Sequence, residues 1–111
     1  MSKVLILLNA GPEDPTRVSS ALGLTRVLKS SPDIENVALI FFGNAVELLT
    51  NPDYKTQAES FLTDGVLTLA CRRHAEQKNL VEQLDVGSVS LKYVGEDIVR
   101  LVKEGYQVIS F

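Results

Sequence analysis

Cys71 and His74 are the one cysteine and the one histidine of the sequence, and they stand three residues apart. A thiolate attacks electrophilic sulfur or carbon, and a nearby imidazole can take up the thiol proton. If a helix begins at Cys71, the two side chains share one of its faces. The spacing therefore makes Cys71 a candidate nucleophile and His74 a candidate supporting group.

Arg72 and Arg73 fill the interval between Cys71 and His74. Their positive charge, together with the amides at a helix N-terminus, would favour the thiolate form of Cys71 and could hold an anionic substrate. Each of these residues also has an interpretation that involves no chemistry. Free cysteines are often small buried hydrophobes, adjacent arginines in an acidic protein are usually solvated, and a charged imidazole opposes the dipole at a helix N-terminus. For Cys71 the two interpretations stay open.

Two further polar residues, Asn9 and Asn44, follow apolar runs and are expected at the same edge of the domain. Either side chain could hydrogen-bond a ligand there. For Asn44, capping of the following helix is the simpler interpretation. Asp14 is interpreted as a helix cap because Pro15 follows it, which argues against Glu13 and Asp14 as an acid–base pair.

The sequence argues against metals and common cofactors. One cysteine excludes an intrachain disulfide framework and a multi-cysteine metal cage, and Cys71 with His74 cannot complete a metal site. Residues 9–14 contain neither a GxGxxG pattern nor a phosphate-binding lysine, and they lack the Ser/Thr-rich loop of a flavin-binding flavodoxin. We expect no metal and no cofactor.

Strands and helices are predicted to alternate along the chain. Short, unalternated aliphatic runs are typical of strands covered on both faces, and helical patterns separate them. Strands are predicted at residues 4–8, 37–42, 66–70, 89–93 and 107–110, and helices at 14–30, 45–49, 55–63, 71–84 and 96–103. The prediction is a flavodoxin- or Rossmann-like three-layer α/β sandwich with a five-stranded, mainly parallel sheet, whose carboxyl edge carries Cys71 after the third strand.

The length and the net charge of the chain argue against several classes of protein. A chain of 111 residues with a net charge of −3 fits one domain, residues 1–111, and lacks the clustered basic residues that bind nucleic acid. Its longest apolar runs are far shorter than the roughly 20 residues that cross a bilayer. We expect a cytoplasmic protein without nucleic-acid or membrane partners.

Four segments together resemble the DsrE/DsrF-like family: residues 4–14, Phe41-Phe42-Gly43 with residues 46–49, residues 66–71, and Lys103-Glu104-Gly105-Tyr106. The resemblance implies a small α/β domain that assembles into trimers or hexamers and serves in intracellular sulfur relay. It also implies that Cys71 carries a persulfide between a donor and an acceptor protein. The absence of a second cysteine fits such a carrier, because no thiol is present to form an internal disulfide.

The leading hypothesis is therefore a sulfur carrier, or sulfurtransferase-like protein, with Cys71 as the persulfide-bearing nucleophile. The alternative is a non-catalytic, homo-oligomeric binding or scaffold domain of the same fold, in which Cys71 is structural. Its motivation is an excess of apolar side chains on short elements, since exposed apolar patches usually mark interfaces. These side chains include Ala45, Val46, Leu48, Leu49 and Phe61.

Overall fold

The computed structural model describes residues 2–111, in which strands and helices alternate as the sequence predicts. The elements follow one another in the order β1 (Ser2–Leu8), α1 (Pro15–Ser30), β2 (Ile34–Phe41), the 3-10 helix η1 (Gly43–Thr50), α2 (Pro52–Thr63), β3 (Leu67–Cys71), α3 (Arg72–Gln77), α4 (Val81–Leu84), β4 (Ser90–Lys92), α5 (Gly95–Lys103) and β5 (Tyr106–Ser110).

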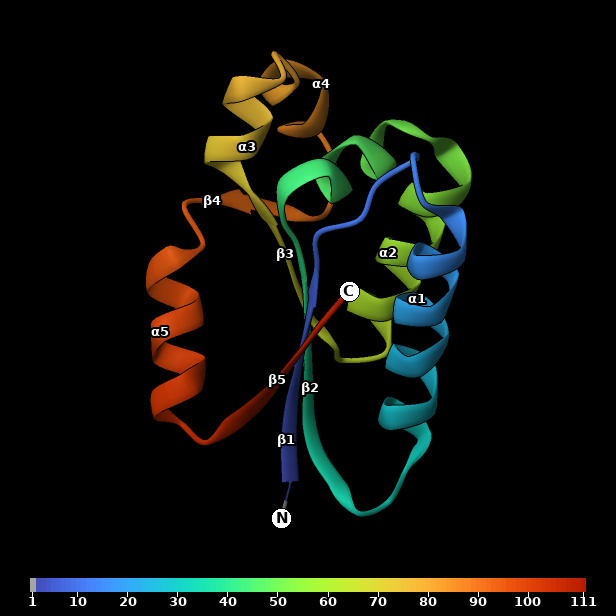
Figure 1. Ribbon diagram of the computed structural model, residues 1–111, viewed down its shortest axis with the longest axis vertical. Coiled ribbons are helices and arrows are strands. Elements are labelled where there is room, and N and C mark those ends of the chain that lie inside the picture. Colours follow the sequence, from blue (N-terminus) through green and yellow to red (C-terminus); the bar gives the residue numbers. More distant parts are fainter. Residues whose placement is uncertain (1) are drawn as a thin grey trace.

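The five described strands form one fully parallel sheet in the order β4-β3-β2-β1-β5. The chain winds outward through four strands and then crosses the whole sheet to place β5 beside β1. This confirms the predicted sandwich, although the order differs from the 2-1-3-4-5 order of flavodoxin. Figure 1 shows α1 and α2 on one face of the sheet and α5 on the other.

Local signals in the sequence explain where the long helices begin and end. Asp14 caps α1 as expected, because its Oδ1 accepts a hydrogen bond from the amide of Arg17 at 3.1 Å. Pro52, which precedes the helix predicted at 55–63, occupies the first turn of α2 behind an Asn51 cap. Gly65, at φ 89°, supplies the left-handed turn after α2.

The segment after Cys71 differs from prediction. One helix was expected from Cys71 to Leu84, but the structure has two short helices, α3 and α4. They are separated at Asn79, which adopts a left-handed φ of 57° that asparagine tolerates better than most residues. Leu80 then donates its amide to the Ala75 carbonyl at 2.9 Å and closes α3. Apolar spacing alone did not reveal this break.

The central strands are buried on both faces, which accounts for their unalternated apolar sequences. Residues 37–41 of β2 are all buried, as are Val4, Leu5, Ile6 and Leu8 of β1. Phe111 packs against the domain: its amide donates to the Leu7 carbonyl and its own carbonyl accepts from the amide of Asn9 at 2.9 Å. The two terminal segments are thereby joined at the carboxyl edge of β1.

A carboxylate anchors α5 to the neighbouring strand. The Asp97 side chain, 8% exposed, accepts hydrogen bonds from Lys92 of β4 and from Arg100, each at 3.1 Å. Burial raises the pKa of Asp97, but these two cationic donors outweigh it and hold the pKa below its ordinary value of 3.8. Among residues 2–111, no helix is long and apolar enough to span a membrane.

Candidate functional site

Cys71 is the last residue of β3 and occupies the N-cap position of α3. The connection from β3 to β4 runs through α3 and α4, which contact η1, whereas β4 leads into α5 on the face opposite α1 and α2 (Figure 1). Ligands of parallel α/β sheets bind where neighbouring strands lead to opposite faces. The placement of Cys71 at the carboxyl edge is therefore as predicted.

A cleft of about 590 Å³ opens at this position. Cys71 forms part of its wall, although the residue as a whole is only 4% exposed. The other lining residues come from the ends of β2 and β4 and the starts of α3 and α5: Phe42, Arg73, His74, Tyr93, Val94, Gly95 and Glu96. The structure thus brings together Cys71, Arg73 and His74 of the predicted site.

His74 is held in one orientation by Phe42 and Gly43, which follow β2. Its Nδ1 accepts a hydrogen bond from the amide of Gly43 at 3.0 Å. Its ring meets Phe42 edge to face, with centroids 4.5 Å apart and an interplanar angle of 84°. Desolvation lowers the pKa of His74 below its ordinary value of 6.5, and the positive charges of Arg73 and Lys78 lower it further. His74 is consequently neutral at pH 7.

The same hydrogen bond defines what His74 can do. A neutral imidazole that accepts at Nδ1 carries its proton on Nε2, so it acts as a donor from its other edge. Within residues 2–111, no hydrogen bond joins His74 to Cys71. The geometry favours His74 as a fixed hydrogen-bond donor beside the cleft rather than as the base that deprotonates the thiol.

The side chains of Arg72 and Arg73 have different surroundings in the structure. Arg72 turns away from the cleft, with Nε 3.6 Å from Glu76 and NH1 3.7 Å from Asp85. Arg73 is exposed and lines the cleft. Arg73 is therefore the arginine placed to meet an anion at Cys71, and Arg72 belongs to surface ion pairs of the kind expected for solvated arginines.

Asn44 does not cap a helix, so the capping interpretation is wrong. Phe42 is the N-cap of η1 and no side chain caps it. Instead, Asn44 donates from Nδ2 to Glu13 and accepts from Lys78, both at 2.9 Å. Glu13 in turn accepts from the amide of Gly11 at 2.7 Å. Asn44 therefore joins three segments, because the fold brings Glu13 and Lys78 to it from distant parts of the chain.

Asn9 has a structural contact at the same edge. Its amide donates to the Phe111 carbonyl, and its side-chain oxygen would lie 3.5 Å from a Cβ placed on Gly43. Neither Asn9 nor Asn44 lines the cleft at Cys71. The structure thus gives Asn9 a place in the packing of the β1 and β2 ends.

Tyr93 and Glu96 line the cleft but were not singled out from the sequence. Tyr93 donates its hydroxyl proton to Glu76 at 2.6 Å, and this hydrogen bond is the largest of the effects that raise the pKa of Tyr93. The sequence signal for both was their position, since they flank the connection that leaves the carboxyl end of β4. Residues 2–111 contain no group of three metal-ligating side chains.

Comparisons with known proteins agree with the fold and leave the chemistry open. No protein-family model and no curated protein matches the sequence. The chain is similar to a conserved protein of unknown function from Bacteroides thetaiotaomicron, with a TM-score of 0.82 and 20% identity over 99% of this chain and 95% of that one. It is also similar to a protein of unknown function from Methanobacterium thermoautotrophicum, with a TM-score of 0.78 and 18% identity over the full length of both chains. These two structures share the α/β fold of this chain.

Proposed function

We propose that the protein is a sulfur carrier of intracellular sulfur relay, in which Cys71 receives a sulfur atom as a persulfide and passes it to an acceptor protein. The observation that carries this proposal is the position of Cys71: its thiol lies at the carboxyl edge of β3, in the wall of a cleft that also presents Arg73 and His74. The resemblance to the DsrE/DsrF-like family supports the same residue.

The transfer is a thiol–persulfide exchange. The Cys71 thiolate attacks the terminal sulfur of a donor persulfide, R–S–SH, so that a new S–S bond forms as the donor S–S bond breaks. The electron pair of the broken bond leaves with the donor as R–S⁻, and Cys71 becomes Cys71–S–SH. No external oxidant is needed. Reversal of this step with an acceptor thiolate delivers the sulfur and regenerates Cys71.

The surroundings support each part of this exchange. Arg73 places an exposed positive charge at the cleft, where it would stabilise the R–S⁻ group that leaves during the exchange. His74 offers its Nε2 proton from a fixed ring. The low exposure of Cys71 would shelter the carried sulfur from other thiols until a partner protein docks over the cleft.

The test is mass spectrometry after incubation with a persulfide donor. Wild-type protein is expected to gain about 32 Da, one sulfur atom, on the peptide containing Cys71. Cys71→Ser should gain none, and Arg73→Ala should be loaded more slowly while retaining its fold. An unmodified Cys71, in a reaction where glutathione in the same tube becomes persulfidated, would count against the proposal.

A second candidate is a non-catalytic homo-oligomeric binding domain in which Cys71 only packs. The apolar side chains of η1 and α2 that suggested an interface are buried in the core, so that expectation is wrong for them. The observation in favour of this candidate is that Cys71 belongs to the buried core while several large apolar side chains are exposed elsewhere. The rate of alkylation by iodoacetamide separates the candidates. A carrier cysteine should react in the native protein. A structural cysteine should react only after unfolding.

A further inference from the structure

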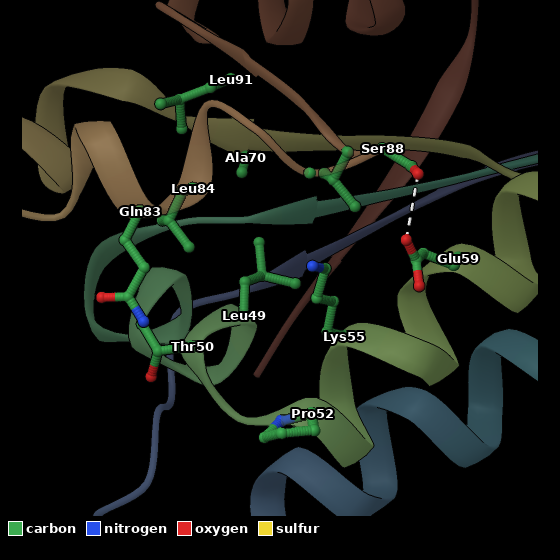
Figure 2. Close-up of a pocket in the computed structure, with 12 residues that line it drawn as sticks. Leu49, Thr50, Pro52, Lys55, Glu59, Ala70, Gln83, Leu84, Ser88 and Leu91 are labelled. Atoms are coloured by element: carbon green, nitrogen blue, oxygen red, sulfur yellow. Dashed lines mark hydrogen bonds between the residues drawn. The ribbon is translucent and has the colours of Figure 1, made fainter.

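A second cavity, of about 230 Å³, lies on the other face of β3 from Cys71. Ala70 forms part of its floor, and successive residues of a strand point to opposite faces, so Ala70 and Cys71 face different sides of the sheet. Figure 2 shows this cavity between η1, α2, α4 and the segment leading to β4. It is therefore a separate feature from the cleft at Cys71.

The floor of this cavity is apolar. Leu49, Ala70, Leu84 and Val89 line it with at most 8% of each residue exposed, and Leu91 completes the wall. A volume near 230 Å³ corresponds to roughly eight groups of water size, at about 30 Å³ each. The cavity thus suits the hydrocarbon part of a small molecule rather than a nucleotide.

The exposed Lys55 is the one cation among the residues that line this cavity. In Figure 2 the amino group of Lys55 points toward Leu49, into the cavity. The end of its stem packs near Gly87, with Cε 3.8 Å from where a Cβ on that glycine would lie. Glu59, one helical turn further along α2, also lines the cavity; it accepts a hydrogen bond from Ser88 at 3.0 Å (Figure 2) and forms no ion pair with Lys55. Across residues 2–111, Lys55 has no ion-pair partner.

We propose that this cavity binds a small monocarboxylate with a branched apolar tail, its carboxylate paired with Lys55 and its tail on the leucine and valine floor. Charge complementarity selects the head group, since a cation beside a low-dielectric wall attracts an anion more strongly than it would in open water. The volume limits the ligand to about eight non-hydrogen atoms. The proposal does not depend on sulfur transfer at Cys71.

The experiment is a titration of ¹⁵N-labelled full-length protein with 4-methylpentanoate, followed by amide chemical shifts. Saturable shifts are expected at Leu84, Gly87 and Leu91, with little change at Val94 in the other cleft. Lys55→Met should weaken binding at least fivefold. Lys103→Met, which removes an exposed lysine from α5, should bind as the wild type does.

The neutral amide of the same acid distinguishes charge pairing from apolar filling. 4-Methylpentanamide should bind at least fivefold more weakly than the carboxylate. Equal affinity for the two compounds, unchanged affinity in Lys55→Met, or no saturable shift up to about 10 mM carboxylate would each overturn the proposal, because each removes the role of Lys55 or of the cavity.

Discussion

The hydrogen bond that His74 accepts from Gly43 determines which ring nitrogen carries the proton. The position of His74 near Cys71 does not determine this. The amide lies 3.0 Å from Nδ1, and protonation of that nitrogen would break the bond and place a cation near Arg73 and Lys78. The main structural role of His74 is therefore to join α3 to the start of η1. Burial and the positive charges of Arg73 and Lys78 lower its pKa, and this direction predicts how stability depends on pH.

Stability should fall as the solution becomes acidic, through His74. Its ordinary pKa is 6.5 and its pKa in the fold is lower, so the unfolded chain binds more protons in the interval between the two values. The contribution is fully present above pH 6.5 and is lost as the pH falls through the folded pKa. Urea unfolding at pH 7.5 and 5.5 measures it. His74→Asn keeps an acceptor for the Gly43 amide but does not titrate, so its stability should fall less; an equal fall in both proteins would contradict the assignment.

The position of Cys71 could be predicted from the sequence, but the contacts of the residues around it could not. Cys71 could be placed at a sheet edge because a run of apolar residues precedes it and the parallel fold orders strand ends. The partners of Asn44 and His74 could not be predicted, since Glu13 and Gly43 each lie 31 positions away from them and meet them only in the tertiary fold. Local capping rules therefore chose the wrong role for Asn44.

At the element scale, the loop after β1 is fixed by close contact with η1. Gly11 is buried against Asn44, and a Cβ on Gly11 would collide with the carbonyl oxygen of Asn44. The Glu13 carboxylate holds the same loop by accepting the Gly11 amide. This contact aligns the β1 and β2 ends at the edge that carries the candidate site.

Two glycine substitutions should change stability in opposite directions. Gly11→Ala must displace η1 or the loop and is expected to cost about 1–3 kcal/mol of unfolding free energy, as overpacking does. Gly23, inside α1, has no neighbouring atom within 4 Å of where a Cβ would lie, so Gly23→Ala should add about 0.5–1 kcal/mol through helix propensity. Urea denaturation of both variants checks this. A neutral Gly11→Ala would mean that the loop moves freely away from η1.

The ends of helices could be predicted from the sequence where a capping residue or a proline marks them. They could not be predicted where tertiary contacts determine where a helix ends. Asp14 and Gly65 marked the ends of long helices correctly. The break between α3 and α4 was missed because it depends on the left-handed backbone of Asn79, and a single asparagine is a weak signal. The short β4 was the hardest strand to delimit, since its apolar content is low.

At the scale of the whole molecule, the two faces of the sheet are covered unequally. The register pairs Leu5 with both Ala38 and Val108, and Ala38 with Leu67, so these four side chains lie on the face that α5 covers. Leu67 and Val108 remain exposed there. Composition predicted two covered faces, but not that the chain would cross from β4 to β5 and leave this face with α5 as its described helix (Figure 1).

This unequal coverage predicts self-association through the α5 face. Val99 and Val102, three residues apart on α5, are 54% and 52% exposed, and they lie on the same side of the molecule as Leu67 and Val108. Burial of such side chains between copies would stabilise an assembly by removing apolar surface from water. Light scattering should therefore give a mass that is a multiple of 12.2 kDa, with a trimer or hexamer expected from the family resemblance.

A matched pair of variants locates the interface. Val102→Glu places a charge on the α5 face and should shift the protein toward the 12.2 kDa monomer. Val27→Glu makes the same change on α1, where Val27 is 62% exposed on the opposite side of the sheet, and should leave the assembly intact. Because both positions are exposed on helices, neither change should unfold the domain. A monomeric wild-type protein, or equal dissociation of both variants, would show that the α5 face does not hold copies together.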